Sequence, residues 1–200
     1  NSRYILVQEA NTTGGTLYVY DSQTDSFIAG KAAYDLSNEG FGPGSFVNLG
    51  YSAVSSVGGL IANAAYGELL ILDIELNGVI DLAEYQAPGR IAGVDFASDG
   101  GRLFALDTDA DAILVFNTSN WELIGAYGLQ TDVPNVSYLG SDFGEISLSE
   151  DDRLVFVDTD TGFEIVDLNF ASAPVQTASS FADRLYGAQV ADTIDGLSGD

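Results

Sequence analysis

The chain has 200 residues, of which 46% are hydrophobic, a length that suits one domain or part of a larger one. Thirty acidic residues against six basic ones give a net charge of −24 at pH 7, which disfavours nucleic-acid backbones and anionic membranes as partners. Cysteine and histidine are both absent, so disulfides, thiolate or imidazole metal ligands and a Ser-His-Asp triad are excluded.

Short stretches of strand-forming residues, separated by turn residues, recur four times along the chain. The first copy predicts three strands, and each later copy predicts four. In chain order these are Tyr4–Gln8, Thr16–Asp21 and Phe27–Ala33; Tyr51–Val57, Leu60–Ala64, Leu69–Ile74 and Val79–Tyr85; Ile91–Ala97, Arg102–Asp107, Ala112–Asn117 and Glu122–Tyr127; and Glu145–Ser149, Arg153–Asp158, Phe163–Leu168 and Val175–Phe181.

A repeated four-stranded meander of about 40 residues is typical of a β-propeller blade. A β-sandwich also contains many short strands, but it does not explain the fixed order of strand and turn types. We therefore expect an all-β fold, with a β-propeller of four-stranded antiparallel blades over residues 1–184. Two arrangements stay open: a closed four-bladed ring, in which Asp183–Val190 supplies the missing first strand, or part of a larger ring.

The third copy resembles the YVTN-type bacterial β-propeller repeat. The similar residues are the Ser98–Asp107 turn and strand, the Ile113–Thr118 strand and the Glu122–Gly125 ending. The family's turn proline is missing, and Asp107 replaces its usual Asn. The segment Glu150–Asp158 is the next most similar, and the resemblance implies a fold and no specific function.

The end of the chain resembles the start of an RTX nonapeptide array. In Gly187–Asp195, Asp192 falls on the calcium-ligand position and Ile194 on the buried apolar position, whereas Val190 departs from the expected Gly. We expect residues 185–200 to begin such a repeat, or to form a flexible acidic tail. The resemblance implies Ca²⁺ as a cofactor and a bacterial protein that is secreted or surface-attached through a type I route; no signal peptide is visible at Asn1.

Two predicted turns between second and third strands are rich in aspartate. One holds Asp107, Asp109 and Asp111, and the other holds Asp158 and Asp160. Alternate carboxylates in a tight loop are able to converge on Ca²⁺, although the glycine and the bidentate glutamate of an EF-hand are missing. The alternative is that aspartate simply favours a solvated turn, and that the overall acidity suits seawater or brine.

Two functions remain as hypotheses. A propeller enzyme resembling phytases or lactonases would hold a metal in its central channel, near Ser52, Asp95 and Glu145, and hydrolyse an ester. The preferred prediction is a non-catalytic, calcium-binding module for extracellular adhesion, surface assembly or matrix interaction, whose partner is a protein or glycan surface or a further domain of a longer chain. Arg102 and Arg153 are expected to match each other and to pair with turn carboxylates; Trp121 is the aromatic expected to be partly exposed, and most tyrosines are expected in the core.

Overall fold

The computed structural model describes residues 3–9, 16–32, 52–65, 68–82, 91–133, 145–159, 162–168, 175–177 and 193–195. These residues form an all-β fold of antiparallel sheets, with one short parallel pair near the C-terminal end. Among the described residues there is no apolar helix of the length that a membrane crossing requires.

Each of the four main sheets is a meander in chain order. The first contains β1 (Tyr4–Glu9), β2 (Thr16–Asp21) and β3 (Ser26–Ala32). The second contains β4 (Ser52–Val54), β5 (Leu60–Ala65), β6 (Glu68–Asp73) and β7 (Gly78–Asp81), and the third contains β8 (Ile91–Phe96), β9 (Arg102–Asp107), β10 (Ala112–Asn117) and β11 (Leu123–Gly128). The fourth contains β12 (Ile146–Leu148), β13 (Leu154–Thr159) and β14 (Gly162–Asp167).

The sheets share one pairing register, so positions in different sheets are matched through their ladder partners. Tyr4 pairs with Asp21, Leu60 with Asp73, Arg102 with Asn117 and Leu154 with Asp167. The first three sheets also carry a register shift at the same place, where the strand that ends at Asp21, Asp73 or Asn117 meets the last strand of its sheet. The repeat seen in the sequence is therefore a repeat of hydrogen-bonding geometry.

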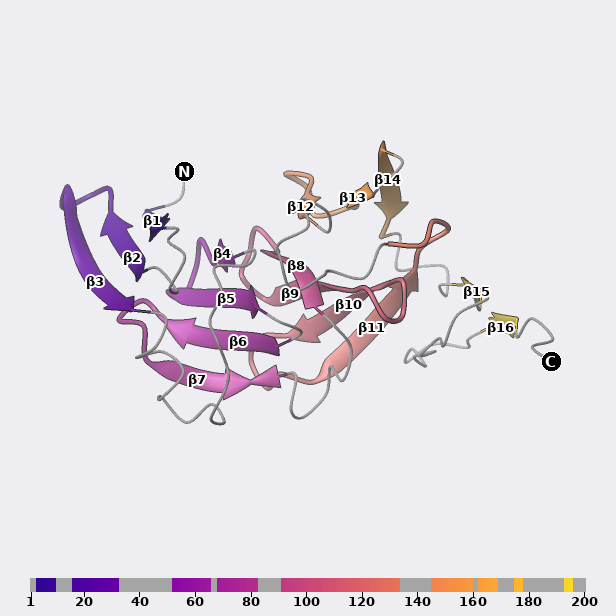
Figure 1. Cartoon of the computed structure of the whole chain (residues 1–200), viewed down its shortest axis with the longest axis horizontal. Coiled ribbons are helices and arrows are strands. Elements are labelled where there is room, and N and C mark those ends of the chain that lie inside the picture. Colours follow the sequence, from indigo (N-terminus) through magenta and orange to yellow (C-terminus); the bar gives the residue numbers. More distant parts are fainter. Residues whose placement is uncertain are drawn as a thin grey trace.

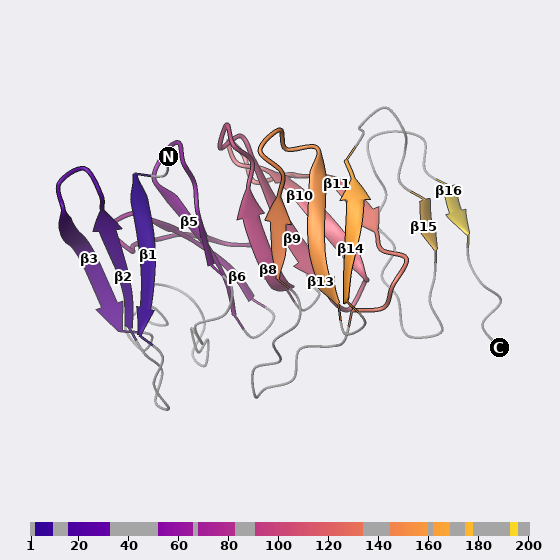
Figure 2. The same cartoon turned by 90° about the horizontal axis from the view of Figure 1, so that it is seen from above.

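The sheets follow one another in chain order, from β1–β3 at one end to β12–β14 at the other (Figures 1 and 2). The strand β4 contacts both β1 and β8, and β8 contacts β12, so the leading strands of successive sheets lie side by side. The four sheets follow a curved path, with the fourth sheet above the third in Figure 1, and the described strands do not form a closed ring.

Three apolar cores fill the spaces between neighbouring sheets. One lies between the first and second sheets around Leu17 and Leu70, the next between the second and third around Ile71 and Phe116, and the last between the third and fourth around Phe104. The third sheet is apolar and buried on both faces, and the pattern of β10 is therefore a continuous buried run with no polar alternation.

The predicted strands agree with the observed ones except at their ends and at the close of the fourth copy. Val175–Phe181 was expected as the last strand of the fourth sheet, but β15 (Val175–Thr177) pairs in parallel with β16 (Thr193–Asp195) instead of with β14. β16 contains the RTX-like apolar residue Ile194. The proposed closing segment Asp183–Val190 lies outside the described residues.

The turns between the first two strands of a sheet correct one sequence match. Gly58, Gly100 and Asp152 occupy equivalent places, since all have positive φ (89°, 70° and 55°). Each lies three residues after the first residue beyond the incoming strand, and the N–H of that residue donates to the first carbonyl of the outgoing strand and so closes the turn. Arg153 therefore matches Gly101 and not Arg102 as predicted. The sequences around Arg102 and Arg153 are similar, but they align with a shift of one residue. The shift arises because an aspartate takes the left-handed position that glycine fills in the other turns.

Candidate functional site

Equivalent side chains fix the turns that follow the third strand of the repeat. Asp21, Asp73 and Asn117 each accept a hydrogen bond at 2.9 Å from the backbone N–H two residues later. Such Asx turns hold the backbone without a ligand. All three lie at the same end of the strands as the turns at Gly58 and Gly100, so the loops at this end of the sheets are ordered.

In the first sheet, an arginine pairs with the aspartate at this end of the strands. The Nη2 of Arg3 lies 2.7 Å from Oδ2 of Asp21, and its Nε lies 3.1 Å from both carboxylate oxygens. These hydrogen bonds from Arg3 lower the pKa of Asp21 to about 2. Arg153 makes the same pair with Asp167 in the fourth sheet, at 2.7 Å, so Arg3 and Arg153 are the matched arginines.

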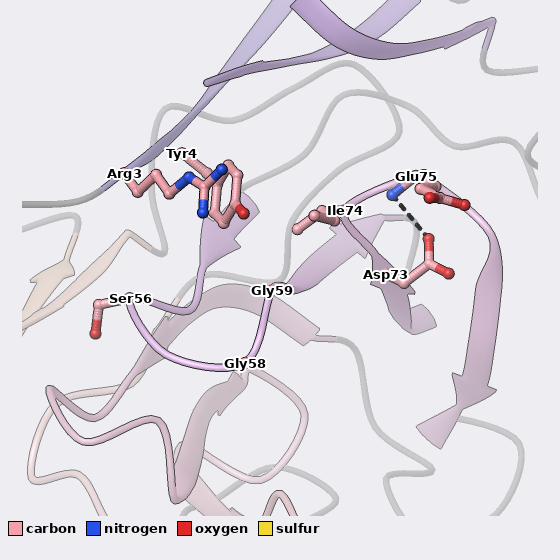
Figure 3. A pocket seen from close by; sticks show the side chains of 8 residues that line it. All are labelled: Arg3, Tyr4, Ser56, Gly58, Gly59, Asp73, Ile74 and Glu75. Atoms are coloured by element: carbon pink, nitrogen blue, oxygen red, sulfur yellow. Dashed lines mark hydrogen bonds between the residues drawn. The ribbon is translucent and has the colours of Figure 1, made fainter. Parts of the chain in front are cut away.

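An open cleft of about 610 Å³ lies beside Arg3, between the first and second sheets (Figure 3). The guanidinium of Arg3 lies 4.9 Å from the centre of the Tyr4 ring at one side of the cleft. The turn at Gly58 forms its floor, and the turn that begins at Asp73 forms the opposite side, as the close-up shows. The lining residues are Arg3, Tyr4, Ser56, Gly58, Gly59, Asp73, Ile74 and Glu75.

The acidic side of the cleft is held in place by donors. Burial raises the pKa of Asp73, but hydrogen bonds from Asn77 and from the N–H of Glu75 outweigh this, so the net pKa lies below its ordinary value. Lys31 of the first sheet donates to the Leu76 carbonyl at 2.9 Å and thereby ties this turn to its neighbour. The cleft thus combines a fixed cation with carboxylates that lie across from it.

Groups of this kind suit binding through hydrogen bonds. Arg3 donates, the carboxylates of Asp73 and Glu75 accept, and Tyr4 supplies an apolar ring. The hydroxyl of Ser56 is already donated to the Ser98 carbonyl at 2.9 Å. We expect the cleft to accept a ligand that carries several hydroxyl groups.

The first predicted calcium turn is a four-residue connection between β9 and β10. Asp107 is buried and accepts hydrogen bonds from the N–H groups of Asp109 and Ala110, at 2.9 and 3.2 Å. Asp111 has φ of 46° and accepts the N–H of Val133 at 2.7 Å. Asp107 therefore orders its own loop, and Asp111 joins this loop to the segment that follows β11. A cation would have to displace these N–H donors or use the lone pairs that they leave free.

The second predicted calcium turn is not equivalent to the first. Thr159, which pairs with Gly162, occupies the place of Asp107, so Asp158 lies inside β13 at the position of Leu106. Asp160 and Asp192 lie outside the described residues. Within the described part of the chain, no group of three acidic side chains is placed to hold a metal ion. Calcium binding at these residues stays a prediction.

Two of the three residues proposed for an enzyme, Asp95 and Ser52, make hydrogen bonds through their side chains. Asp95 accepts the N–H of Phe96 and the N–H of Leu148, both at 2.9 Å, and so links the leading strands of the third and fourth sheets. Burial raises its pKa, and these two N–H donors only partly offset the effect. Ser52 lies 2.6 Å from the amide nitrogen of Asn63, and the carbonyl of Glu145 accepts the N–H of Asp158.

The aromatic residues are mostly structural where they are described. Trp121 is partly exposed, as predicted, and packs against the core between the second and third sheets, but Phe27, Phe156 and Phe163 are more exposed. Tyr127 is buried, which raises its pKa to about 12. Tyr18 and Tyr20 are partly buried and make edge-to-face contacts with the exposed Phe27.

Sequence reasoning missed the polar links between sheets. Asp152 accepts hydrogen bonds from the backbone and side chain of Ser98, at 2.8 to 3.0 Å, and Glu164 accepts the N–H groups of Gln130 and Thr131. These contacts join residues more than 30 positions apart, and strand periodicity carries no signal for them.

Comparison with known proteins shows a shared fold. No protein-family model matches the chain, and no curated protein matches it. Among solved structures, a chain of hydrazine synthase from Kuenenia stuttgartiensis matches with a TM-score of 0.56 and 15% sequence identity. The match covers 82% of this chain and 43% of that chain, so this chain spans less than half of its structural neighbour. At this identity the similarity concerns the fold alone.

Proposed function

We propose that the four sheets are the blades of a β-propeller and that the chain is a non-catalytic binding module. Two observations support the propeller: the sheets share one register, and their leading strands lie side by side. The fold similarity to hydrazine synthase, a propeller-containing protein, points the same way.

The cleft between the first and second sheets is the observation that carries the binding function. Its carboxylate and guanidinium groups are ordered before any ligand arrives, because Asn77 holds Asp73 and Asp21 holds Arg3. Ordered polar groups lose little entropy on binding. A hydroxyl-rich glycan on an extracellular surface is the ligand we propose, with adhesion or surface assembly as the outcome.

Calcium binding and secretion are part of the same proposal and rest on the RTX resemblance of residues 187–200. The net charge of −24 favours it, since bound cations would relieve repulsion among thirty carboxylates. Calcium would then favour folding outside the cell, where its concentration is high.

Binding to immobilised glycans and matrix proteins tests the cleft directly. Glu75→Gln removes one charge from the cleft and keeps the shape of the side chain, and Glu122→Gln makes the same change at an exposed turn of the third sheet. We expect Glu75→Gln to weaken binding about tenfold, or about 1.4 kcal/mol, and Glu122→Gln to leave it unchanged. Equal binding by the wild type and both variants would place the ligand elsewhere.

A further inference from the structure

The two ends of the row of sheets expose large apolar side chains. On the fourth sheet, Phe156, Phe163 and Ile165 are 39%, 71% and 50% exposed. On the first sheet, Ile5, Val7 and Phe27 are 46%, 40% and 60% exposed. Two apolar patches at opposite ends of one molecule are a feature that a solvated surface does not require.

The shared register explains the patch on the fourth sheet. Phe156 is paired with Ile165, as Phe104 is paired with Val115 in the third sheet, and Phe163 corresponds to Ile113. Phe104, Ile113 and Val115 are each 0% exposed, because they pack in the core against the fourth sheet. The outer face of the fourth sheet therefore repeats a face that the next sheet covers.

The patch on the first sheet is the opposite half of such a contact. Ile5 and Val7 correspond to Leu103 and Ala105, which are buried against the preceding sheet, and Phe27 corresponds to Leu123. Phe27 is flanked by the rings of Tyr18 and Tyr20, with ring centres 5.6 and 5.4 Å away. The outer face of the first sheet thus repeats a face that a preceding sheet covers.

We propose that a second copy of this chain docks on these faces, head to tail, and closes a ring of eight sheets. The fourth sheet of each copy packs on the first sheet of the other, which continues the interface that joins the third and fourth sheets within one copy. Since one chain carries both halves of that interface, a second copy offers faces that match. Two identical head-to-tail contacts close under two-fold symmetry when each copy spans half of the ring.

Charge opposes this docking, because each copy carries a net charge of −24 at pH 7. Added salt should therefore strengthen the dimer.

Sedimentation velocity over a range of protein and salt concentrations tests the proposal on the whole chain. We expect a monomer and a species of twice its mass, with the larger one favoured by salt. Phe163→Asp and Phe27→Asp each change one exposed residue of one face, and each should leave only monomer. Val79→Asp is the matched control, because Val79 is 48% exposed on β7 and belongs to neither face.

A mixture of the two variants separates head-to-tail docking from other dimers. Phe27→Asp retains an intact fourth sheet and Phe163→Asp an intact first sheet, so the mixture should regain a one-to-one pair that neither forms alone. A wild type that is monomeric at every concentration and salt, a Phe163→Asp dimer, or a mixture without pairs would overturn the proposal. Glycan binding by a monomer would leave the proposed function standing.

Discussion

Replacement of Asp152 tests how neighbouring sheets are joined. Its side chain is 11% exposed and receives three contacts of 2.8 to 3.0 Å from Ser98 of the third sheet. Arg102 lies 3.7 Å away, a distance at which an ion pair near the surface contributes little. The backbone at Asp152 is left-handed, with φ of 55°. Asp152 thus stabilises the fold through its hydrogen bonds with Ser98 and destabilises it through its left-handed backbone conformation.

In a glycine variant these two effects oppose each other, whereas in an alanine variant the hydrogen bonds are lost and the backbone cost remains. Loss of hydrogen bonds to an ionised acceptor costs about 2 kcal/mol here, the low end of the usual range, because Ser98 is exposed and water replaces part of the contact. Glycine recovers about 1 kcal/mol from the left-handed backbone, and alanine recovers none. We expect Asp152→Gly to lower the free energy of unfolding by about 1 kcal/mol, and Asp152→Ala by about 2 to 3 kcal/mol.

Urea unfolding at neutral pH measures both variants, with Asp152→Asn as the conservative control that keeps one oxygen and tolerates a positive φ. A double-mutant cycle with Ser98→Ala isolates the contact, and a coupling of at least about 0.5 kcal/mol is expected. Equal losses for alanine and glycine would refute the left-handed backbone. Losses below about 0.5 kcal/mol in all variants would refute the link between the sheets.

Four further predictions concern stability. Calcium should raise the melting temperature more than sodium does at matched ionic strength, because binding adds about 2.7 kcal/mol to the free energy of unfolding at one hundred times its dissociation constant. Asp109→Asn should reduce this temperature shift more than Asp132→Asn does, and a shift equal to that of sodium would favour the solvated-turn alternative. Because Arg3 lowers the pKa of Asp21 to about 2, the stability from this pair should be complete above pH 4 and disappear between pH 4 and 2, and an Asp21→Asn variant should lack this step in acid titrations of unfolding. Burial raises the pKa of Asp95, so ionisation opposes folding; as the pH rises from 4 to 7, Asp95→Asn should gain stability relative to the wild type, and a constant difference would contradict this. Gly59→Ala should lower the free energy of unfolding by more than about 1 kcal/mol, because φ is 64° and the new Cβ would lie 2.9 Å from Ile74. Gly58→Ala meets no atom within 4 Å and should cost about 1 kcal/mol for its φ alone. Chemical unfolding that ranks the two variants in reverse would argue against this packing.

The strands could be predicted from the sequence because their signal is local. Thr16–Asp21, Arg102–Asp107 and Ala112–Asn117 were predicted with their observed bounds, since turn residues mark both ends of each. The pairing of β15 with β16 could not be predicted in this way, because it joins segments that local alternation treats as independent.

The candidate site was harder to predict, because its residues meet only in three dimensions. Arg3 and Asp73 are 70 positions apart and come together through the packing of two sheets. The acidic turns looked equivalent because both contain Asp-Thr-Asp, yet the ladder places Thr159 and not Asp158 opposite the start of its partner strand. The similar residue types predicted the wrong alignment of the two turns, and only the hydrogen bonds between the strands distinguish them.

A disulfide between the second and third sheets tests the order of the sheets most directly. A Cβ added at Gly100 would lie 3.2 Å from the Cβ of Val57, which is closer than the roughly 3.5 to 4.5 Å usual for a disulfide. A small outward shift of the exposed Val57 would allow the bond, and the wild type has no cysteine to interfere. We expect the Val57→Cys, Gly100→Cys double variant to lose both thiols under mild oxidation, while a Val57→Cys, Gly162→Cys control keeps them. Two free thiols in the first variant, or equal oxidation of both, would contradict sheets that pack side by side in chain order.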